Sequence, residues 1–173
     1  PESLPPWSDD GGIFITGATG FLGAHMVAEL ASALEPGQKL FALVRADDHD
    51  GARRRLEQTL TTAGLTTPGI GAGSLDSSPV VALAGSLESD RFGLDAALYE
   101  RLCAEVSLVH HVGASVSFDR GYEGLREANV LGTRRILRFA VENRLKALHF
   151  VSSLNVAHVI ERCGTRPALE ISR

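Results

Sequence analysis

Five short apolar runs divide the chain, and stretches in which apolar residues recur at helical spacing lie between them. The runs that predict strands are 13–16, 40–45, 80–84, 106–110 and 147–152. The stretches that predict helices are 21–34, 48–60, 94–103 and 122–143, the last as one long helix or a broken pair. Residues 66–79 are rich in Thr, Gly, Ser and Pro, which predicts a surface loop.

The predicted strands are continuously apolar rather than alternating. Such strands, separated by helices of ten or more residues, are typical of a parallel sheet that helices cover on both faces. We therefore predict an α/β fold of the Rossmann-like class. It would have a doubly wound parallel sheet with the strand order 3-2-1-4-5, numbered along the chain.

Composition indicates a single domain and argues against membrane or nucleic acid as a partner. With 173 residues, of which 44% are apolar, the chain can bury one core. A net charge of -4, from 17 Lys and Arg against 21 Asp and Glu, lacks the basic excess that nucleic-acid binding demands. No apolar run approaches the roughly 18 residues of a membrane span, and the opening residues do not form a signal peptide. We expect a cytoplasmic protein that binds neither membrane nor nucleic acid.

The start of the domain follows from composition. Residues 1–11 contain three prolines and a Ser-Asp-Asp-Gly stretch, which predicts a linker ahead of a domain that begins at Gly12. Position 1 is Pro rather than Met, so we interpret the chain as a segment of a longer polypeptide. Cys103 and Cys163 are too far apart for metal-ligand spacing, and two thiols make no disulfide framework, so we expect both to be reduced.

The strongest motif is a glycine-rich turn between the first predicted strand and the first predicted helix. Gly17, Gly20 and Gly23 form a G-x-x-G-x-x-G pattern. In this context the first glycine permits a sharp turn, the second lets phosphates approach the backbone, and the third lets the helix pack against the strand. The helix then presents its unpaired N–H groups to a pyrophosphate. The pattern therefore predicts a dinucleotide site.

The end of the second strand predicts which dinucleotide binds. An acidic residue there usually takes the ribose 2′-hydroxyl of NAD, whereas an Arg accommodates the 2′-phosphate of NADP. Here the strand ends in Arg45, which favours NADP. Of the three consecutive arginines 53–55 in the next helix, we expect one to reach the same pocket and the others to pair with Asp50 or Glu57.

Two further strand ends contribute candidate residues. The third strand leads into Ser86, whose hydroxyl or backbone could contact the adenine. The fourth leads into His110 and His111, a pair that suggests a metal site. We reject a metal site because adjacent residues on a strand face opposite ways and no third ligand is spaced nearby. Packed or hydrogen-bonded histidines are the alternative.

Several runs together resemble one family. They are FITGATGFLG (14–23), LVRA (43–46), YEGL (122–125), ANVLGT (128–133) and VSS (151–153). Over roughly residues 12–156 the chain resembles the thioester reductase domains that terminate nonribosomal peptide synthetases and carboxylic acid reductases. These domains are extended short-chain dehydrogenase/reductases.

The resemblance implies a role for particular residues. The cofactor would be NADPH, with Arg45 and Arg55 at the 2′-phosphate and Ser153 as the hydroxyl member of a Ser/Thr-Tyr-Lys catalytic set. The remaining cofactor residues would be Gly17, Thr19, Gly20, Phe21, Leu22 and Gly23 at the phosphates, Ser86 and Leu87 at the adenine, and Val112, Gly113 and Ala114 toward the nicotinamide.

The chain departs from the family at several positions. Ser86 replaces the usual Asp, Val112 a small or amide residue, and Ser117 the frequent Asn. The Tyr-x-x-x-Lys pair is also missing, since Cys103 and Arg126 follow the two tyrosines at that spacing. In the family this pair lies after the fifth strand, so we interpret residues 157–173 as the start of a truncated substrate lobe. We expect the segment alone to bind NADPH without turnover.

The implied function is NADPH-dependent release of an acyl or peptidyl thioester from the phosphopantetheine arm of a carrier protein. The product would be an aldehyde or, after a second reduction, an alcohol. Three alternatives stay open: another extended short-chain dehydrogenase or epimerase, a redox-silent cyclising release domain of the same fold, and a carrier-docking module without catalysis. An acid in place of Arg45 would be more typical of the epimerases.

Overall fold

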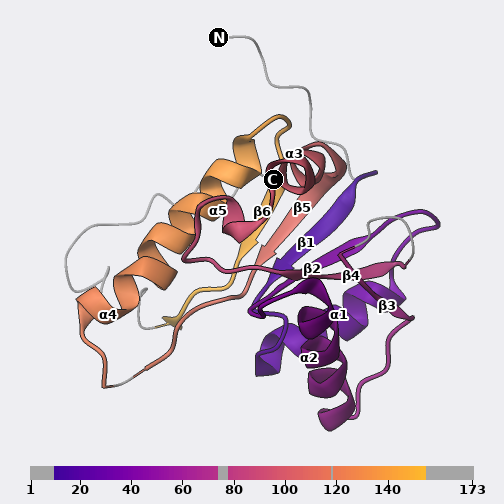
Figure 1. The fold of residues 1–173 in the computed structure, drawn as a ribbon, viewed down its shortest axis with the longest axis horizontal. Helices are drawn as coiled ribbons and strands as arrows, with labels where there is room; N and C mark the ends of the chain where they lie inside the picture. Colours follow the sequence, from indigo (N-terminus) through magenta and orange to yellow (C-terminus); the bar gives the residue numbers. More distant parts are fainter. Residues whose placement is uncertain (1–9, 74–77, 118, 155–173) are drawn as a thin grey trace.

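The computed structural model describes residues 10–73, 78–117 and 119–154, and strands alternate with helices along most of this part of the chain (Figure 1). The strands are β1 (Gly12–Thr16), β2 (Leu40–Val44), β3 (Ile70–Ala72), β4 (Val80–Ala84), β5 (Val106–His111) and β6 (Ala147–Phe150). The helices are α1 (Phe21–Ser32), α2 (His49–Thr62), α3 (Ala96–Glu105), α4 (Tyr122–Arg126) and α5 (Gly132–Val141), with a short 3-10 turn η1 (Asp90–Gly93) and a π-helical segment η2 (Glu127–Leu131).

All six strands lie in one parallel sheet in the order β3-β4-β2-β1-β5-β6. The five predicted strands correspond to β1, β2, β4, β5 and β6, and their order in the sheet confirms the predicted 3-2-1-4-5 arrangement. The chain runs from β1 to β2 and β4 on one side and then crosses over to β5 on the other side of β1, so a switch point lies between β1 and β5. Ligands of open α/β sheets bind at the carboxyl ends of the strands beside such a point.

The predicted loop over residues 66–79 is partly wrong, because it contains the edge strand β3. Ile70, Gly71 and Ala72 pair with Val80, Val81 and Ala82 of β4. Three residues with a central glycine carry too little apolar pattern to indicate a strand. This strand forms through its ladder with β4, which sequence periodicity does not reveal.

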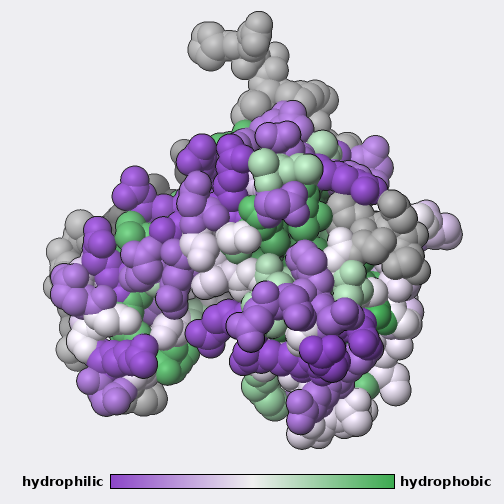
Figure 2. Space-filling model, viewed as in Figure 1, coloured by the Kyte–Doolittle hydropathy of each residue, from purple (hydrophilic) through white to green (hydrophobic). Residues whose placement is uncertain are grey.

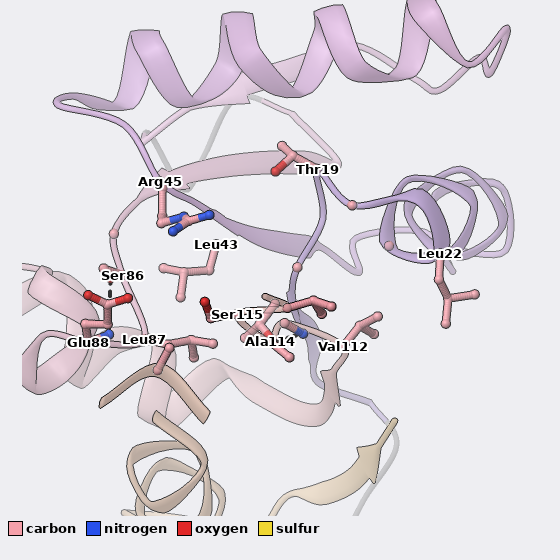
Figure 3. A pocket seen from close by; sticks show the side chains of 18 of the residues that line it. Thr19, Leu22, Leu43, Arg45, Ser86, Leu87, Glu88, Val112, Ala114 and Ser115 are labelled. Carbon is pink, nitrogen blue, oxygen red and sulfur yellow. Dashed lines mark hydrogen bonds between the residues drawn. The ribbon is translucent and has the colours of Figure 1, made fainter. Parts of the chain in front are cut away.

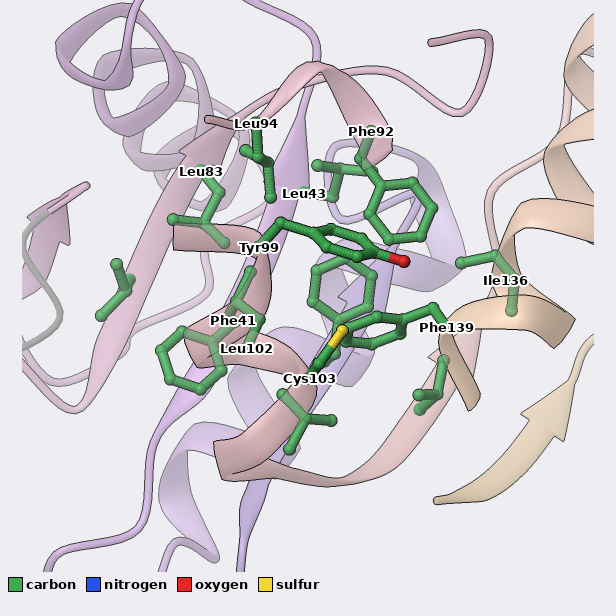
Figure 4. Close-up of a cluster of buried hydrophobic side chains, with 14 residues drawn as sticks. Phe41, Leu43, Leu83, Phe92, Leu94, Tyr99, Leu102, Cys103, Ile136 and Phe139 are labelled. Carbon is green, nitrogen blue, oxygen red and sulfur yellow. The ribbon is translucent and has the colours of Figure 1, made fainter. Parts of the chain in front are cut away.

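Helices cover both faces of the sheet, so the central strands β1 and β2 are buried along their whole length, whereas the edge strand β6 is partly exposed. In Figure 1, α1 and α2 lie on one face and α3 and α5 on the other. Alternate residues of β1 accordingly enter two cores: Ile13 and Ile15 pack with α1 and α2, whereas Phe14 packs with α3 and α5. Figure 4 shows the second core, in which the rings of Phe92, Tyr99 and Phe139 lie together. The Phe14 ring packs against Phe92 and Phe139, with centroids 5.4 and 5.1 Å away. This packing fixes the strand ends that form the site.

The predicted helix over 122–143 is one helix interrupted by a π-helical segment. α4, η2 and α5 follow one another without a break in helical backbone angles. Single π-helical turns of this kind occur frequently at functional sites. Ala128 of this segment lines a hollow at the strand ends.

Some predictions fall at or beyond the limits of the described residues. The expected linker lies almost wholly in residues 1–9, and the expected lobe at 157–173 lies outside the described residues altogether. Within the described ranges, no helix combines the length and the apolar character that a membrane span requires.

Candidate functional site

A hollow of about 370 Å³ lies at the carboxyl ends of β1, β2, β4 and β5. Figure 2 shows a notch between the part of the molecule that carries α4 and the part that carries α1 and α2. Inside the hollow, Figure 3 shows Arg45, Ser86 and Glu88 at one end and Leu22 and Val112 at the other. The lining residues are Thr16, Gly17, Thr19, Gly20, Phe21, Leu22, Gly23, Leu43, Arg45, Arg55, Gly85, Ser86, Leu87, Glu88, Val112, Gly113, Ala114, Ser115, Val116 and Ala128.

The three glycines of the turn differ in how closely other atoms of the chain approach them. Gly17 has φ +74°, and a Cβ there would lie 2.7 Å from Cα of Gly113. A Cβ on Gly23 would lie 2.0 Å from the carbonyl oxygen of Gly17, so only glycine lets α1 start this close to β1. A Cβ on Gly20 would meet only the Gly17 oxygen, at 3.3 Å. Packing within the chain therefore demands glycine at positions 17 and 23 but not at 20.

The start of α1 offers a site for negative charge. Gly20 is the N-cap, no side chain caps it, and the first turn holds no acidic residue. The first N–H groups of a helix have no partner within the helix, and the helix dipole places partial positive charge there. Thr19, Gly20 and Leu22 of this turn line the hollow. An anion in the hollow would thus face unpaired N–H donors.

The structure separates the three consecutive arginines as expected. Arg53 pairs with Glu57 at 2.8 Å and with Asp50 at 3.7 Å. Arg55 instead lines the hollow together with Arg45, and its Nη1 donates to the Arg45 carbonyl oxygen at 2.8 Å. This hydrogen bond ties α2 to the end of β2, so two guanidinium groups reach the same end of the hollow.

Ser86 and Leu87 follow β4 and form the wall opposite these arginines. The Ser86 amide donates to the Phe92 carbonyl oxygen at 2.9 Å, and the Ser86 hydroxyl oxygen accepts from the Glu88 amide at 3.1 Å. Arg91 and Phe92 hold left-handed backbone angles, with φ +48° and +62°. Such angles are rare for residues other than glycine and persist only where surrounding structure holds them. Buried Phe92 anchors this turn, which in turn holds Ser86.

The loop after β5 forms the third wall. Val112, Gly113 and Ala114 line the hollow, and the Gly113 amide donates to Oγ1 of Thr16 at 3.0 Å. Ser115, the next residue of this loop, pairs with the Asn129 side chain of η2. Oδ1 of Asn129 accepts from the Ser115 amide at 2.7 Å, and Nδ2 donates to the Ser115 carbonyl oxygen at 2.9 Å. The π-helical segment therefore holds this loop against the strand ends.

The two adjacent histidines face opposite sides of the sheet. His111 is buried and hydrogen-bonded to Thr16 and Thr133, as the interpretation of a packed histidine predicted. His110 packs edge-to-face on His149, with ring centroids 4.8 Å apart. Burial lowers the pKa of His111 to about 4, and burial also lowers the pKa of His110, so both are neutral near pH 7. The described residues contain no group of three His, Cys, Asp or Glu that could hold a metal ion.

Ser153 is the one predicted site residue that does not line the hollow. The fifth predicted strand ends at Phe150 rather than at residue 152, so Ser153 lies three residues beyond β6, in an exposed segment. The shortened strand corrects the expectation that Ser153 closes it. All of the predicted cofactor-binding residues line the hollow.

Several lining residues were missed from the sequence. Thr16, Leu43, Gly85, Ser115 and Val116 neighbour predicted residues and follow from the same strand ends. Glu88 adds a carboxylate at the Arg45 end, and Ala128 reaches the hollow from η2. For Ala128 the sequence carried no signal, because its place depends on how the helix packs.

These features define a Rossmann-like dinucleotide-binding domain: a glycine-rich turn at the helix that starts beside the switch point, and cations at the end of the next strand. The chain belongs to the Male sterility protein family of NAD-binding domains, whose pattern matches residues 15–168. Its cofactor class is therefore a nicotinamide dinucleotide.

The chain has relatives among nonribosomal peptide synthetases and reductases. The chain is 39% identical over 154 residues to the non-canonical nonribosomal peptide synthetase cpsA of Aspergillus campestris, covering 88% of this chain and 14% of cpsA. It is 37% identical over 141 residues to the L-2-aminoadipate reductase large subunit of Penicillium chrysogenum, covering 82% of this chain and 10% of that protein. The chain thus spans a small part of these relatives.

The chain also resembles a solved structure in its backbone fold. The terminal R domain from the myxalamid PKS-NRPS biosynthetic pathway is 35% identical and superposes with a TM-score of 0.77. The match covers 89% of this chain and 38% of that domain. The chain is homologous to the terminal reductase domains of nonribosomal peptide synthetases and matches their dinucleotide-binding fold.

Proposed function

We propose that this chain is the NADPH-binding part of a reductase domain that releases an acyl or peptidyl thioester from a carrier protein. The observation that carries the proposal is that Arg45 and Arg55 line the same hollow as the glycine-rich turn. A dinucleotide whose pyrophosphate lay at the start of α1 would have its adenosine end toward these guanidinium groups. A 2′-phosphate there would meet two cations.

The residues of this chain fit such a cofactor. Gly20 lines the hollow without a side chain, and the first turn of α1 has donors without acidic neighbours. Arg45 and Arg55 would hold the 2′-phosphate, and Ser86 with Leu87 would border the adenine. Ser86 keeps its hydroxyl hydrogen for a ligand, because its oxygen is the acceptor in the bond from Glu88.

The other end of the hollow has a different character. Leu22, Val112 and Ala114 make it apolar, and the Gly113 backbone packs closely against Gly17. An uncharged nicotinamide ring fits an apolar wall with few polar groups. We assign Val112, Gly113 and Ala114 to the stretch from ribose to nicotinamide.

When bound, NADPH would supply the hydride for the overall reaction thioester + NADPH + H⁺ → aldehyde + thiol + NADP⁺. The hydride would form a C–H bond at the thioester carbonyl carbon, the carbonyl oxygen would take a proton, and breakage of the C–S bond would then release the thiol. Ser153 would donate a hydrogen bond to that oxygen. A second reduction of the aldehyde would give an alcohol.

The names of the relatives support this assignment. They include nonribosomal peptide synthetases, an aldehyde reductase (lnbA) of Aspergillus flavus at 36% identity, and a thiolation-reductase di-domain from an archaeal synthetase. A carrier protein with a phosphopantetheine arm is therefore the partner that we propose. General acid–base catalysis contributes about 10²–10⁴-fold, so the chain without a Tyr-Lys pair should bind cofactor and turn over slowly at best.

Calorimetric titration of the chain with NADPH and with NADH tests the cofactor assignment. We expect NADPH to bind at least about tenfold tighter, since a charge-assisted hydrogen bond contributes about 1.5–3 kcal/mol. Arg45→Ala should reduce this preference, because Arg55 remains as the second cation, and leave NADH binding nearly unchanged. Arg53→Ala is the matched control, because Arg53 pairs with Asp50 and Glu57. Equal affinity of the unmodified chain for both dinucleotides would refute the assignment.

A further inference from the structure

A buried histidine joins two walls of the hollow without lining it. His111 is the last residue of β5 and is 1% exposed. Its ring lies against Phe150 with centroids 5.2 Å apart, and both of its nitrogens are hydrogen-bonded. Nδ1 lies 2.8 Å from Oγ1 of Thr16 on β1, and Nε2 lies 3.2 Å from Oγ1 of Thr133 on α5.

The neighbouring hydrogen bonds determine where the proton on His111 lies. The Thr133 hydroxyl donates its one hydrogen to the Asn129 carbonyl at 2.6 Å, so toward His111 it can only accept. Nε2 therefore carries the proton. Nδ1 is then the acceptor, and the Thr16 hydroxyl donates to it while its oxygen accepts from the Gly113 amide at 3.0 Å.

The hydrogen bonds therefore form a series in which every donor points the same way. The Gly113 amide donates to Thr16, and the Thr16 hydroxyl donates to His111. His111 donates to Thr133, and the Thr133 hydroxyl donates to the Asn129 carbonyl oxygen. The Asn129 side chain then binds both backbone groups of Ser115. Burial keeps His111 neutral, because it lowers the pKa to about 4, so this arrangement of donors and acceptors holds near pH 7.

The series of bonds begins and ends in the loop after β5, at Gly113 and Ser115, which line the hollow. Between these ends it passes through Thr16, which directly precedes Gly17 of the glycine-rich turn. None of the bonds in the series joins His111 to Arg45 or to η1. Beside the direct bond from Gly113 to Thr16, His111 is thus a second connection between the turn and the wall that faces it across the switch point.

We propose that His111 is a positioning residue, which holds the glycine-rich turn and the Val112–Ser115 wall at the separation that the nicotinamide half of the cofactor requires. This inference rests on the proposed function, since it assigns the nicotinamide half to that wall. The adenosine half, at Arg45 and Ser86, lies outside the network. Loss of His111 should therefore affect the two halves of the cofactor differently.

Three substitutions divide the network. His111→Phe keeps an aromatic ring against Phe150 and removes both hydrogen bonds. His111→Asn places an acceptor near the position of Nδ1 and keeps the Thr16 bond, whereas His111→Gln places a donor near the position of Nε2 and keeps the Thr133 bond. His110→Phe is the matched control, because His110 is its buried neighbour on the other face of the sheet and lies outside the network.

Two ligands report on the two halves in calorimetric titrations of the chain. NADPH occupies both halves, and adenosine 2′,5′-bisphosphate lacks the nicotinamide and its ribose. We expect His111→Phe to weaken NADPH binding roughly 30-fold, the equivalent of two hydrogen bonds of about 1 kcal/mol each, and to leave bisphosphate binding within about twofold. The Asn and Gln variants should each recover part of the loss, and His110→Phe should bind both ligands as the unmodified chain does.

The outcomes separate the inference from the proposed function. Equal weakening of both ligands in His111→Phe would mean a general structural role and overturn the inference. Unchanged NADPH binding, or the same pattern in His110→Phe, would overturn it as well. An unmodified chain that bound neither ligand would overturn the proposed function itself, and the inference with it.

Discussion

Replacing Gly23 by Ala should destabilise the fold through one backbone contact. The added Cβ would lie 2.0 Å from the Gly17 carbonyl oxygen, 2.7 Å from its carbonyl carbon and 3.1 Å from Cα of Ala18. All three atoms belong to the backbone of the turn, so no side-chain rotation relieves the contact. The start of α1 must instead move away from β1.

The expected cost combines two opposing effects. Overpacking of a well-packed site costs about 3 kcal/mol at the upper end of its usual range. Alanine is about 1 kcal/mol better than glycine inside a helix, which offsets part of this cost. We therefore expect the free energy of unfolding to fall by about 2 kcal/mol, or the melting temperature by about 4–8 °C for a chain of this length.

Urea unfolding followed by circular dichroism measures the change, and two other glycines serve as comparisons. Gly69→Ala should be nearly neutral, because its Cβ would have nothing within 4 Å and its φ is not positive. Gly20→Ala should also leave stability nearly unchanged but weaken NADPH binding, since its Cβ would meet the space proposed for the phosphates. If Gly23→Ala unfolded at the urea concentration of the unmodified chain, the packing reasoning would be wrong.

Two further predictions concern stability. Asp48→Ala should lower the free energy of unfolding by about 1 kcal/mol, because the Asp48 side chain caps α2 by accepting from the Gly51 amide at 2.6 Å; thermal melts against Asp47→Ala check this. Acid should also destabilise the fold through His111, whose pKa of about 4 lies below the unfolded value of about 6.5. The unfolded state binds more protons in that window, so stability present above pH 6.5 is lost as the pH falls toward 4, by up to about 3 kcal/mol. His111→Asn should flatten this pH dependence in urea titrations, and an unchanged slope would contradict it.

Most of the fold is predictable because its signals are local. The predicted strands are runs of mostly apolar residues, and the central ones are buried along their length, as in Leu40–Val44, where every residue is buried. The cap at Asp48 is likewise a property of neighbouring residues. β3 was not predicted because it depends on its pairing with β4, and the π-helical segment at Glu127–Leu131 has no pattern of its own in the sequence.

The residues of the site also differ in whether neighbouring or distant residues position them. The glycine-rich turn and Arg45 are visible in the sequence because a turn and a strand end are made of consecutive residues. The left-handed angles at Arg91 and Phe92, which hold Ser86, give no sequence signal, since the residues are not glycine. The His111 bonds join residues 95 and 22 positions apart, and adjacent histidines are equally consistent with packing on either face.

The two ends of the hollow differ in how far their contacts reach. Backbone N–H groups and two guanidinium groups surround the end that we propose for the phosphates, and their attraction for phosphates acts over several ångströms and tolerates small displacements. The end that we propose for the nicotinamide has apolar walls and only short-range contacts, so its separation from the turn must be held by hydrogen bonds of defined length. His111, Thr16, Thr133 and Asn129 supply such bonds. Substitutions at the local motif should therefore weaken every ligand that carries the phosphates, whereas substitutions in the network should weaken only ligands that carry the nicotinamide half.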